Sequence, residues 1–178
     1  MVQNKIILVD EFNGQNQYHQ LTSSSTVTAR DDTTVTIQLT EAQRVWGIDK
    51  SGTPGGNGGA ITLSLNAGAL VDVATNELAT THNIPVNETL DSIRPYTLSA
   101  SIDYSDGVLV ITASETVDGT PSTNINTALI SLLDEGTVTV TSNRIVNLAG
   151  AEVTQRNGLS FTVKLSEAQR VSALEISG

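Results

Sequence analysis

Apolar residues alternate with Ser, Thr and charged residues over most of the chain, which is the period of a β-strand with one buried and one solvated face. The clearest case is a pair of runs, 96–104 and 108–114, joined by Ser-Asp-Gly. Asp-Gly favours a tight hairpin turn because glycine adopts positive φ without strain. Further strands are predicted over residues 5–9, 34–39, 60–65, 69–73, 128–133, 137–141 and 159–165. The pattern predicts an all-β chain.

One segment of the chain occurs twice. Residues 27–45 match residues 153–171 without a gap, at an offset of 126 residues (153 minus 27), and both copies contain Glu-Ala-Gln-Arg-Val. A weaker match, in a shifted register, relates 6–11 to 129–135. One repeat is therefore about 126 residues long, and we expect the chain to begin inside one unit and to end inside the next.

The repeated Glu-Ala-Gln-Arg-Val interrupts the β alternation. Thr40 with Gln43, and Ser166 with Gln169, have the spacing of a capping box, which satisfies free amide donors at the start of a helix. We predict a short helix of one or two turns in each repeat, at 41–45 and 167–171. The glycine-rich residues 50–59 are predicted to form a loop.

Two motifs resemble the bacterial immunoglobulin-like repeats of very large surface proteins, of the type noted in cyanobacterial swimming proteins. Residues 107–118, GVLVITASETVD, are similar to that family's G-x-L-x-x-x-F-S-E-x-V hairpin, with Ala113 in place of Phe. Residues 70–76, LVDVATN, are similar to its closing V-x-D-x-A-G-N, with Thr75 in place of Gly. The resemblance covers about residues 33–178. It implies immunoglobulin-like β-sandwich units with one short helix per repeat.

The resemblance also implies how the chain divides. Residues 1–90 are expected to form an immunoglobulin-like unit that lacks its opening hairpin. Residues 91–178 are expected to form a second unit that lacks its closing strands. Two ways of covering the open edges remain. Residues 91–125 could fold back onto the first unit, as in a circular permutation, or a neighbouring chain could supply strands.

Charge and composition exclude several classes of protein. The formal net charge is −10, from 19 acidic and 9 basic residues, which argues against binding to nucleic acid or to anionic lipid. There is no cysteine, so thiol catalysis, disulfides and cysteine-held metals are excluded. No apolar run reaches the roughly 7–15 residues of a secretory signal or the length of a membrane helix. No membrane insertion is expected.

The sequence offers no constellation typical of an enzyme. His19 and His82, the two histidines, lie in polar stretches without a partner at a catalytic or metal-binding spacing, and both are predicted in surface loops. The glycine-rich loop lacks the Lys-Ser/Thr of a phosphate-binding loop. We therefore predict no catalysis and no cofactor.

Calcium is a weaker alternative. The oxygen ligands considered for it are Asp72, Asn76, Asp103, Asp106 and Asp118. No segment supplies the alternating oxygen ligands of a dedicated calcium loop, and turn chemistry accounts for each residue singly.

Five residues are candidates for an interface. Glu41 and Arg44, and likewise Glu167 and Arg170, lie three apart on the predicted helices and are expected to form ion pairs within each helix. Because both pairs recur, a contact between units is the alternative reading. Trp46, which is Ser172 in the second copy, joins them as an interface candidate.

These features together predict a non-catalytic structural subunit of an extracellular or virion surface assembly, of the capsid-decoration, fibre or sheath type. Its expected partner is a further copy or another structural protein. No signal peptide is visible, and a virion protein exposed at lysis needs none. The alternative is a fragment of a giant secreted adhesin or motility protein. A carbohydrate-binding module is disfavoured because the chain has only six aromatic residues (one Trp, three Tyr, two Phe).

Overall fold

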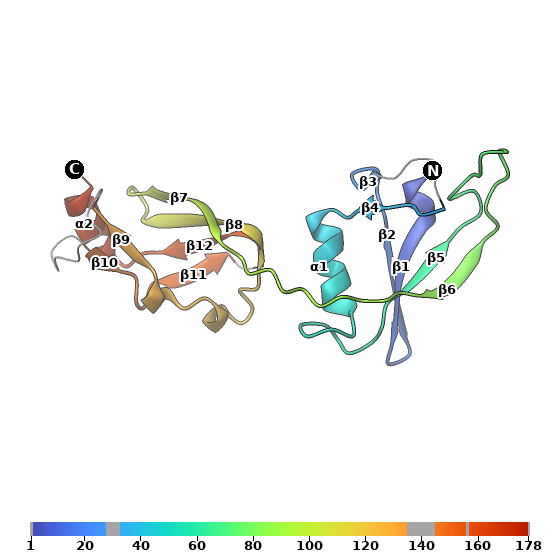
Figure 1. Cartoon of the computed structure of the whole chain (residues 1–178). Helices are drawn as coiled ribbons and strands as arrows, with labels where there is room; N and C mark the ends of the chain where they lie inside the picture. The colour runs from blue at the N-terminus through green and yellow to red at the C-terminus, as the bar shows by residue number, and fades with distance from the viewer. Residues whose placement is uncertain (1, 28–32, 135–144, 156, 178) are drawn as a thin grey trace. The chain divides into compact units, whose positions relative to one another are not determined.

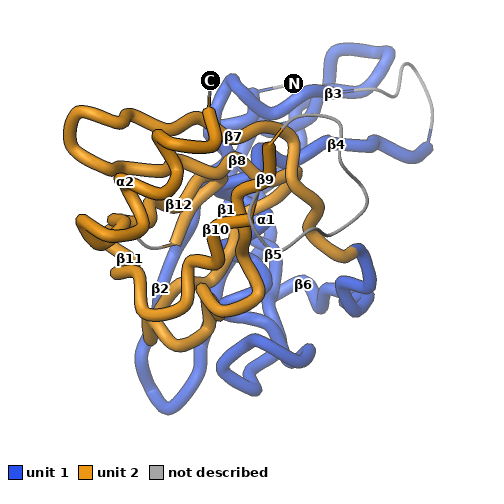
Figure 2. The backbone as a smooth tube through the Cα atoms, turned by 90° about the vertical axis from the view of Figure 1, so that its left-hand side faces the viewer, with its two compact units in different colours: residues 1–93 blue, residues 94–178 orange. Residues whose placement is uncertain are grey.

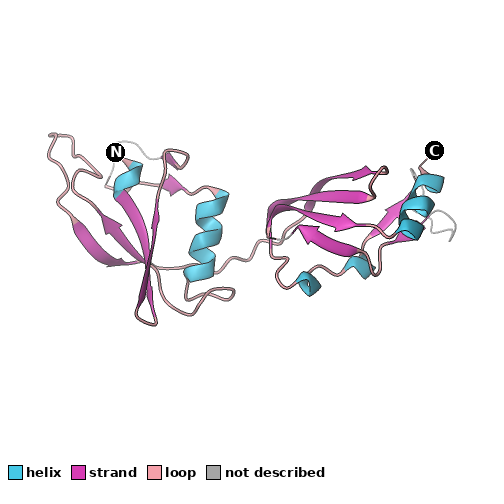
Figure 3. Ribbon diagram, turned by 180° about the vertical axis from the view of Figure 1, so that it is seen from behind, coloured by secondary structure: helices cyan, strands magenta, loops and turns pink. Residues whose placement is uncertain are grey.

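The structure is a computed structural model, and it describes residues 2–27, 33–134, 145–155 and 157–177. The chain is all-β with few helices, as the alternation predicts (Figures 1 and 3). It divides into two compact units, Met1–Ile93 and Arg94–Gly178 (Figure 2). The sequence placed this division between residues 90 and 91.

Unit 1 contains one four-stranded antiparallel sheet, in the order β2-β1-β5-β6, and a separate two-stranded pairing of β3 with β4. Its strands are β1 (Ile6–Phe12), β2 (Gln15–Gln20), β3 (Thr26–Val27), β4 (Ile37–Gln38), β5 (Thr62–Leu65) and β6 (Thr81–Pro85), and helix α1 (Glu41–Lys50) follows β4. Ile6, Leu21 and Ala69 form its buried cluster, which Leu8 and Leu63 cover in part. Ile6 and Leu8, which alternate along β1, thus contribute to this cluster, in accord with the strand period.

Unit 2 also contains a four-stranded antiparallel sheet, in the order β11-β12-β8-β7, and a separate pairing of β9 with β10. Its strands are β7 (Thr97–Asp103), β8 (Val108–Val117), β9 (Ser131–Leu133), β10 (Ile145–Asn147), β11 (Glu152–Gln155) and β12 (Gly158–Lys164), and helix α2 (Glu167–Ile176) comes last. Its buried cluster consists of Leu109, Ile111, Val146, Leu148, Val163, Leu165 and Ala173.

The predicted hairpin and both helices are present. Gly107 has φ +72° in the turn between β7 and β8, so the Asp-Gly signal is confirmed. Both helices begin with a complete capping box at Thr40 and Ser166. Each helix has 10 residues, longer than one or two turns. Both copies continue without a helix-breaking proline up to the same Ser-Gly, which marks the end of each helix.

Several predicted strands differ in the structure. Residues 69–73 form a turn with a single bridge from Val71 to Glu77, because Asp72 bonds locally to Asn76 and Thr75 has φ +70°. Only Ile37–Gln38 of 34–39 is a strand. Within 128–133, Thr127–Leu129 is a 3₁₀ helix and only Ser131–Leu133 is extended. The strand predicted at 137–141 lies outside the described residues. Two further 3₁₀ helices cover Gln3–Lys5 and Ser122–Asn124.

Candidate interaction surface

Each unit contains the same set of described elements, here called the repeat body, which lies within residues 6–50 of unit 1 and 130–176 of unit 2. It consists of a first hairpin (β1–β2 or β9–β10), a second strand pair (β3–β4 or β11–β12) and a helix. The second pair keeps its register at the repeat offset: Val27 faces Ile37, and Val153 faces Val163.

The first hairpin of the repeat body also closes in the same way in both copies. The Leu21 amide donates to the Ile6 carbonyl over 2.9 Å, and the Leu148 amide donates to the Ile130 carbonyl over 2.9 Å. Ile130 therefore holds the place of Ile6, and Leu148 holds the place of Leu21. The two copies share backbone pairing as well as sequence.

One glutamine fastens each helix to its repeat body. The Gln43 side-chain oxygen accepts hydrogen bonds from the Thr40 amide and from the Ser25 hydroxyl, at 2.8 and 2.7 Å. The Gln169 side-chain oxygen accepts from the Ser166 backbone amide at 2.9 Å, and the Gln169 side-chain nitrogen donates to the Asn147 and Ala149 carbonyls. Each glutamine thus caps its helix and ties it to the segment after the first hairpin. The capping spacing predicted the first role, and nothing local in the sequence signals the second.

Glu41 and Arg44 form the predicted ion pair on α1. The Arg44 guanidinium donates to both Glu41 carboxylate oxygens, at 2.8 and 2.9 Å, and to the Asp91 carboxylate at 2.7 Å. Hydrogen bonding to Glu41, more than to Asp91, raises the pKa of Arg44 above its ordinary value. Arg44 therefore links α1 to the end of its own unit.

Glu167 and Arg170 form the equivalent pair on α2. Arg170 donates to the two Glu167 oxygens at 2.8 and 2.6 Å and to the Tyr104 carbonyl at 2.8 Å. The hydrogen bond from Arg170 lowers the pKa of the Glu167 carboxyl. A side chain at Gly107 would lie 3.2 Å from the Arg170 Cδ, so glycine makes room for the arginine over the β7–β8 turn. The described residues of unit 1 hold no hairpin equivalent to β7–β8, and Arg44 bonds to Asp91.

Trp46 lies on α1 but is not brought together with the charged pair. Its indole stacks on the imidazole of His19, with ring centroids 5.1 Å apart and an angle of 29° between the planes. The prediction of a surface loop for His19 is wrong: the residue is half-buried on β2. The residues around His19 are polar and do not alternate with apolar ones, so the sequence predicts no strand there. The apolar partner of His19 is Trp46, which lies on a helix distant in the sequence.

The two units differ in which edge of the repeat body carries further strands. In unit 1, β1 pairs with β5 on the edge opposite β2, whereas β4 pairs only with β3 among the described strands. In unit 2, β12 pairs with β8, whereas β9 pairs only with β10 in the described part of the chain. Each unit therefore has partner strands on the edge that the other leaves open. Since β7 and β8 pair within the sheet of unit 2, they do not complete the sheet of unit 1.

Exposure of equivalent side chains follows this difference. Val9 on β1 is 2% exposed, whereas Leu133, its equivalent on β9, is 55% exposed. Val153 on β11 is 7% exposed, whereas its equivalent on β3, Val27, is 36% exposed. The apolar faces next to the open edges are thus the ones left uncovered. Exposed apolar surface beside a free strand edge marks a site for strand pairing.

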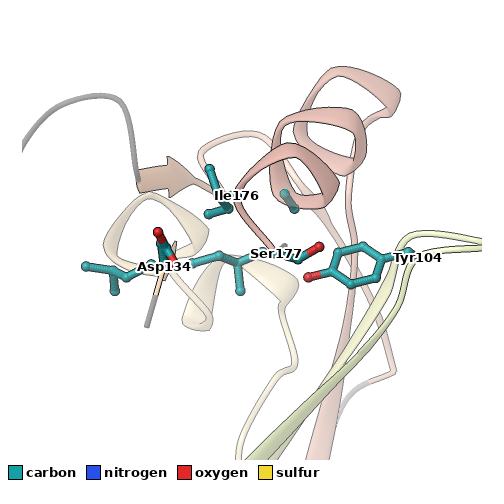
Figure 4. Close-up of a pocket in the computed structure, with 7 residues that line it drawn as sticks. Tyr104, Asp134, Ile176 and Ser177 are labelled. Carbon is teal, nitrogen blue, oxygen red and sulfur yellow. The ribbon is translucent and has the colours of Figure 1, made fainter. Parts of the chain in front are cut away.

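A hollow of about 280 Å³ adjoins the open edge of β9. Its lining combines the end of β9, the end of α2 and the β7–β8 turn, contributed by Leu132, Leu133, Asp134, Ala173, Ile176, Ser177 and Tyr104 (Figure 4). Figure 4 shows the Tyr104 ring reaching toward Ser177, opposite Asp134. Sequence reasoning matched Asp134 to Asp10 but assigned it no role.

The aspartates considered for calcium serve as turn acceptors. Asp72 accepts from Asn76, and Asp103 accepts from Ser105, and these hydrogen bonds lower the pKa of both carboxyls. Asp106 and Asp118 accept from backbone amides two residues later. Within the described residues no three His, Asp or Glu side chains gather as metal ligands.

None of the helices in the described residues is long and apolar enough to cross a membrane. No family model, curated protein or solved structure gives a significant match to the chain. The resemblance to bacterial immunoglobulin-like repeats therefore stays a prediction from the sequence.

Proposed function

We propose that the chain is a non-catalytic structural subunit of an extracellular or virion surface assembly, built from immunoglobulin-like repeats. The observation that carries this proposal is the repeat body, which occurs twice with the same strand register and the same helix caps. Repeated bodies that contact through sheet edges are suited to extended scaffolds, whereas chemistry requires a cleft with converging reactive groups.

A complete repeat would be a sandwich of two four-stranded sheets. The repeat body of unit 1 carries β5 and β6 on one edge, and that of unit 2 carries β8 and β7 on the other. A body with both additions would have sheets in the orders β2-β1-β5-β6 and β11-β12-β8-β7. Two antiparallel sheets of this size are the usual make-up of an immunoglobulin-like sandwich.

The open edges provide the means of assembly. Arg44 and Arg170 each donate to a glutamate of the same helix, and the proposed contact runs through the strand edges. Backbone pairing along an edge supplies affinity, and the exposed apolar side chains supply buried area.

Light scattering and electron microscopy on the purified chain test the proposal. At micromolar concentration we expect particles larger than one chain, with repeated contacts visible as rings, fibres or arrays. A stable monomer at every concentration would contradict assembly by copies of the chain and favour the alternative, a fragment of a giant secreted adhesin or motility protein. The length of the natural gene separates the two, because an adhesin gene encodes a far longer chain.

A further inference from the structure

We propose that the open edge of β9, together with the hollow beside it, is a binding site for a closing segment. The closing segment is defined as a glycine-rich loop followed by a β-hairpin, of the kind that residues 52–88 form in unit 1. The inference rests on the proposed function and deepens it, because it names what the open edge of unit 2 binds.

The backbone groups of β9 are divided between its two edges. Ile130 and Leu132 face β10, since Ile130 accepts from Leu148 and the pairing continues at Leu132 with Val146. Backbone groups alternate sides along an antiparallel strand, so those of Ser131 and Leu133 point to the opposite edge.

The equivalent residues in unit 1, Ile7 and Val9, face Ser64 and Thr62 of β5. The site therefore predicts a register in which Ser131 pairs with the equivalent of Ser64, and Leu133 pairs with the equivalent of Thr62.

In unit 1 the loop that precedes β5 packs on the end of α1. The Asn57 side-chain amide donates to the buried Asp10 carboxylate over 2.8 Å, and the Gly58 backbone amide donates to the Ser51 carbonyl over 3.2 Å. A side chain at Gly56 would lie 2.1 Å from the Ser51 carbonyl oxygen, so the loop lies directly on the end of α1. The loop thus occupies the space between Asp10 and Ser51.

The hollow in unit 2 lies at the place that the glycine-rich loop occupies in unit 1. Its lining residues Asp134 and Ser177 hold the positions of Asp10 and Ser51 in the repeat body. Leu174, the equivalent of Ile48, is half exposed, whereas Ile48 lies against Gly55 of the loop. A glycine-rich loop on the end of α2 would fill the hollow and cover Leu174.

A second copy of the chain could supply a closing segment only by withdrawing it from its own β1. Among the described residues there are two repeat bodies but one closing segment, and that segment already pairs with β1. A copy that lent it would open the edge of its own β1, so the gain at β9 would be offset by an equal loss. The ligand is accordingly the closing segment of a further repeat on a partner chain.

An extended chain tests the site. Residues 53–90 are appended after Gly178, because Ser51-Gly52 aligns with Ser177-Gly178. Amide hydrogen exchange is measured at a concentration where light scattering gives the mass of one chain. We expect exchange at Ser131 and Leu133 to slow at least about tenfold, since a paired strand amide exchanges only through opening.

The matched control carries Thr62→Pro and Ser64→Pro in the appended copy only, because proline cannot donate to the strand ladder. Asp134→Ala in the extended chain should also lower the protection, by removing the acceptor for the appended Asn57. Equal exchange in the extended and control chains, or protection that falls elsewhere, overturns the proposal.

A synthetic peptide of residues 52–88 added to the unmodified chain gives a second readout. Slower exchange at Ser131 and Leu133 supports the site, and saturating peptide without any change contradicts it. These measurements follow single chains. Failure of the purified protein to assemble would count against the proposed function and would leave the exchange results unchanged. Unchanged exchange would count against the β9 site alone.

Discussion

The Ser25 hydroxyl donates a 2.7 Å hydrogen bond to the side-chain oxygen of Gln43, and both residues are buried. Through this bond the segment after the first hairpin holds the N-terminus of α1, because the same oxygen also accepts from the Thr40 backbone amide. In unit 2 the half-buried Gln169 reaches backbone carbonyls instead. Glutamine at this position of the repeat body thus accepts from a buried hydroxyl in unit 1 and donates to backbone carbonyls in unit 2.

Gln43→Ala should destabilise unit 1 by about 1–3 kcal/mol, because it leaves a buried hydroxyl and a helix-end amide without an acceptor. The transition is followed by the fluorescence of Trp46 during urea unfolding, since Trp46 is the single tryptophan and lies in unit 1. Gln169→Ala is the matched control and should leave this transition unchanged. An unaltered midpoint in Gln43→Ala would show that the buried bond does not stabilise the unit.

Two glycines close together in unit 1 should respond in opposite directions. Gly47→Ala should stabilise α1 by roughly 0.5–1 kcal/mol, because alanine is the better helix former and the nearest atom to its Cβ is 3.9 Å away. The second copy already has Ala173 at this position. Gly56→Ala should destabilise the unit by about 1–3 kcal/mol, because its Cβ would overlap the Ser51 carbonyl. Thermal unfolding followed at Trp46 measures both changes, and the same sign for both would refute the packing of the loop on α1.

Acid should weaken the attachment of α2 through Glu167. A carboxyl whose pKa is lowered by folding adds stability above its unfolded pKa, and this is lost as pH falls through the folded pKa. Arg170 lowers the pKa of Glu167 in this way. Carboxyl chemical shifts in an NMR titration should place the pKa of Glu167 below that of an unpaired glutamate. In Arg170→Gln the pKa should return toward the ordinary value, and an unchanged pKa would contradict the ion pair.

His19→Ala should expose one face of the Trp46 indole, which stacks on the imidazole. We expect the tryptophan emission of the folded protein to move to longer wavelength and the unit to lose about 0.5–1.5 kcal/mol of stability. His82→Ala is the matched control, because His82 is exposed on β6 of the same unit. An emission maximum that stays in place would show that the stacking is not maintained in solution.

The sequence by itself determined the features that depend on neighbouring residues. The Asp-Gly turn, the capping boxes at Thr40 and Ser166 and the paired strands β7 and β8 are local patterns, and the structure contains them. Burial alternates along β8, whereas β7 is mostly exposed, with Leu98 at 59%. A capping box needs only residues three apart, and a hairpin needs a turn with positive φ between alternating runs. The all-β class follows from the same patterns.

Only the tertiary structure decided what depends on distant partners. The alternation at 34–39 predicts a full strand, yet only Ile37–Gln38 pairs. The equivalent strand β12 is longer because it lies between β11 and β8. His19 became half-buried because Trp46 came to lie on it. The length of a strand and the burial of a side chain are set by the elements that pack on them, and a chain position cannot show whether those elements are present.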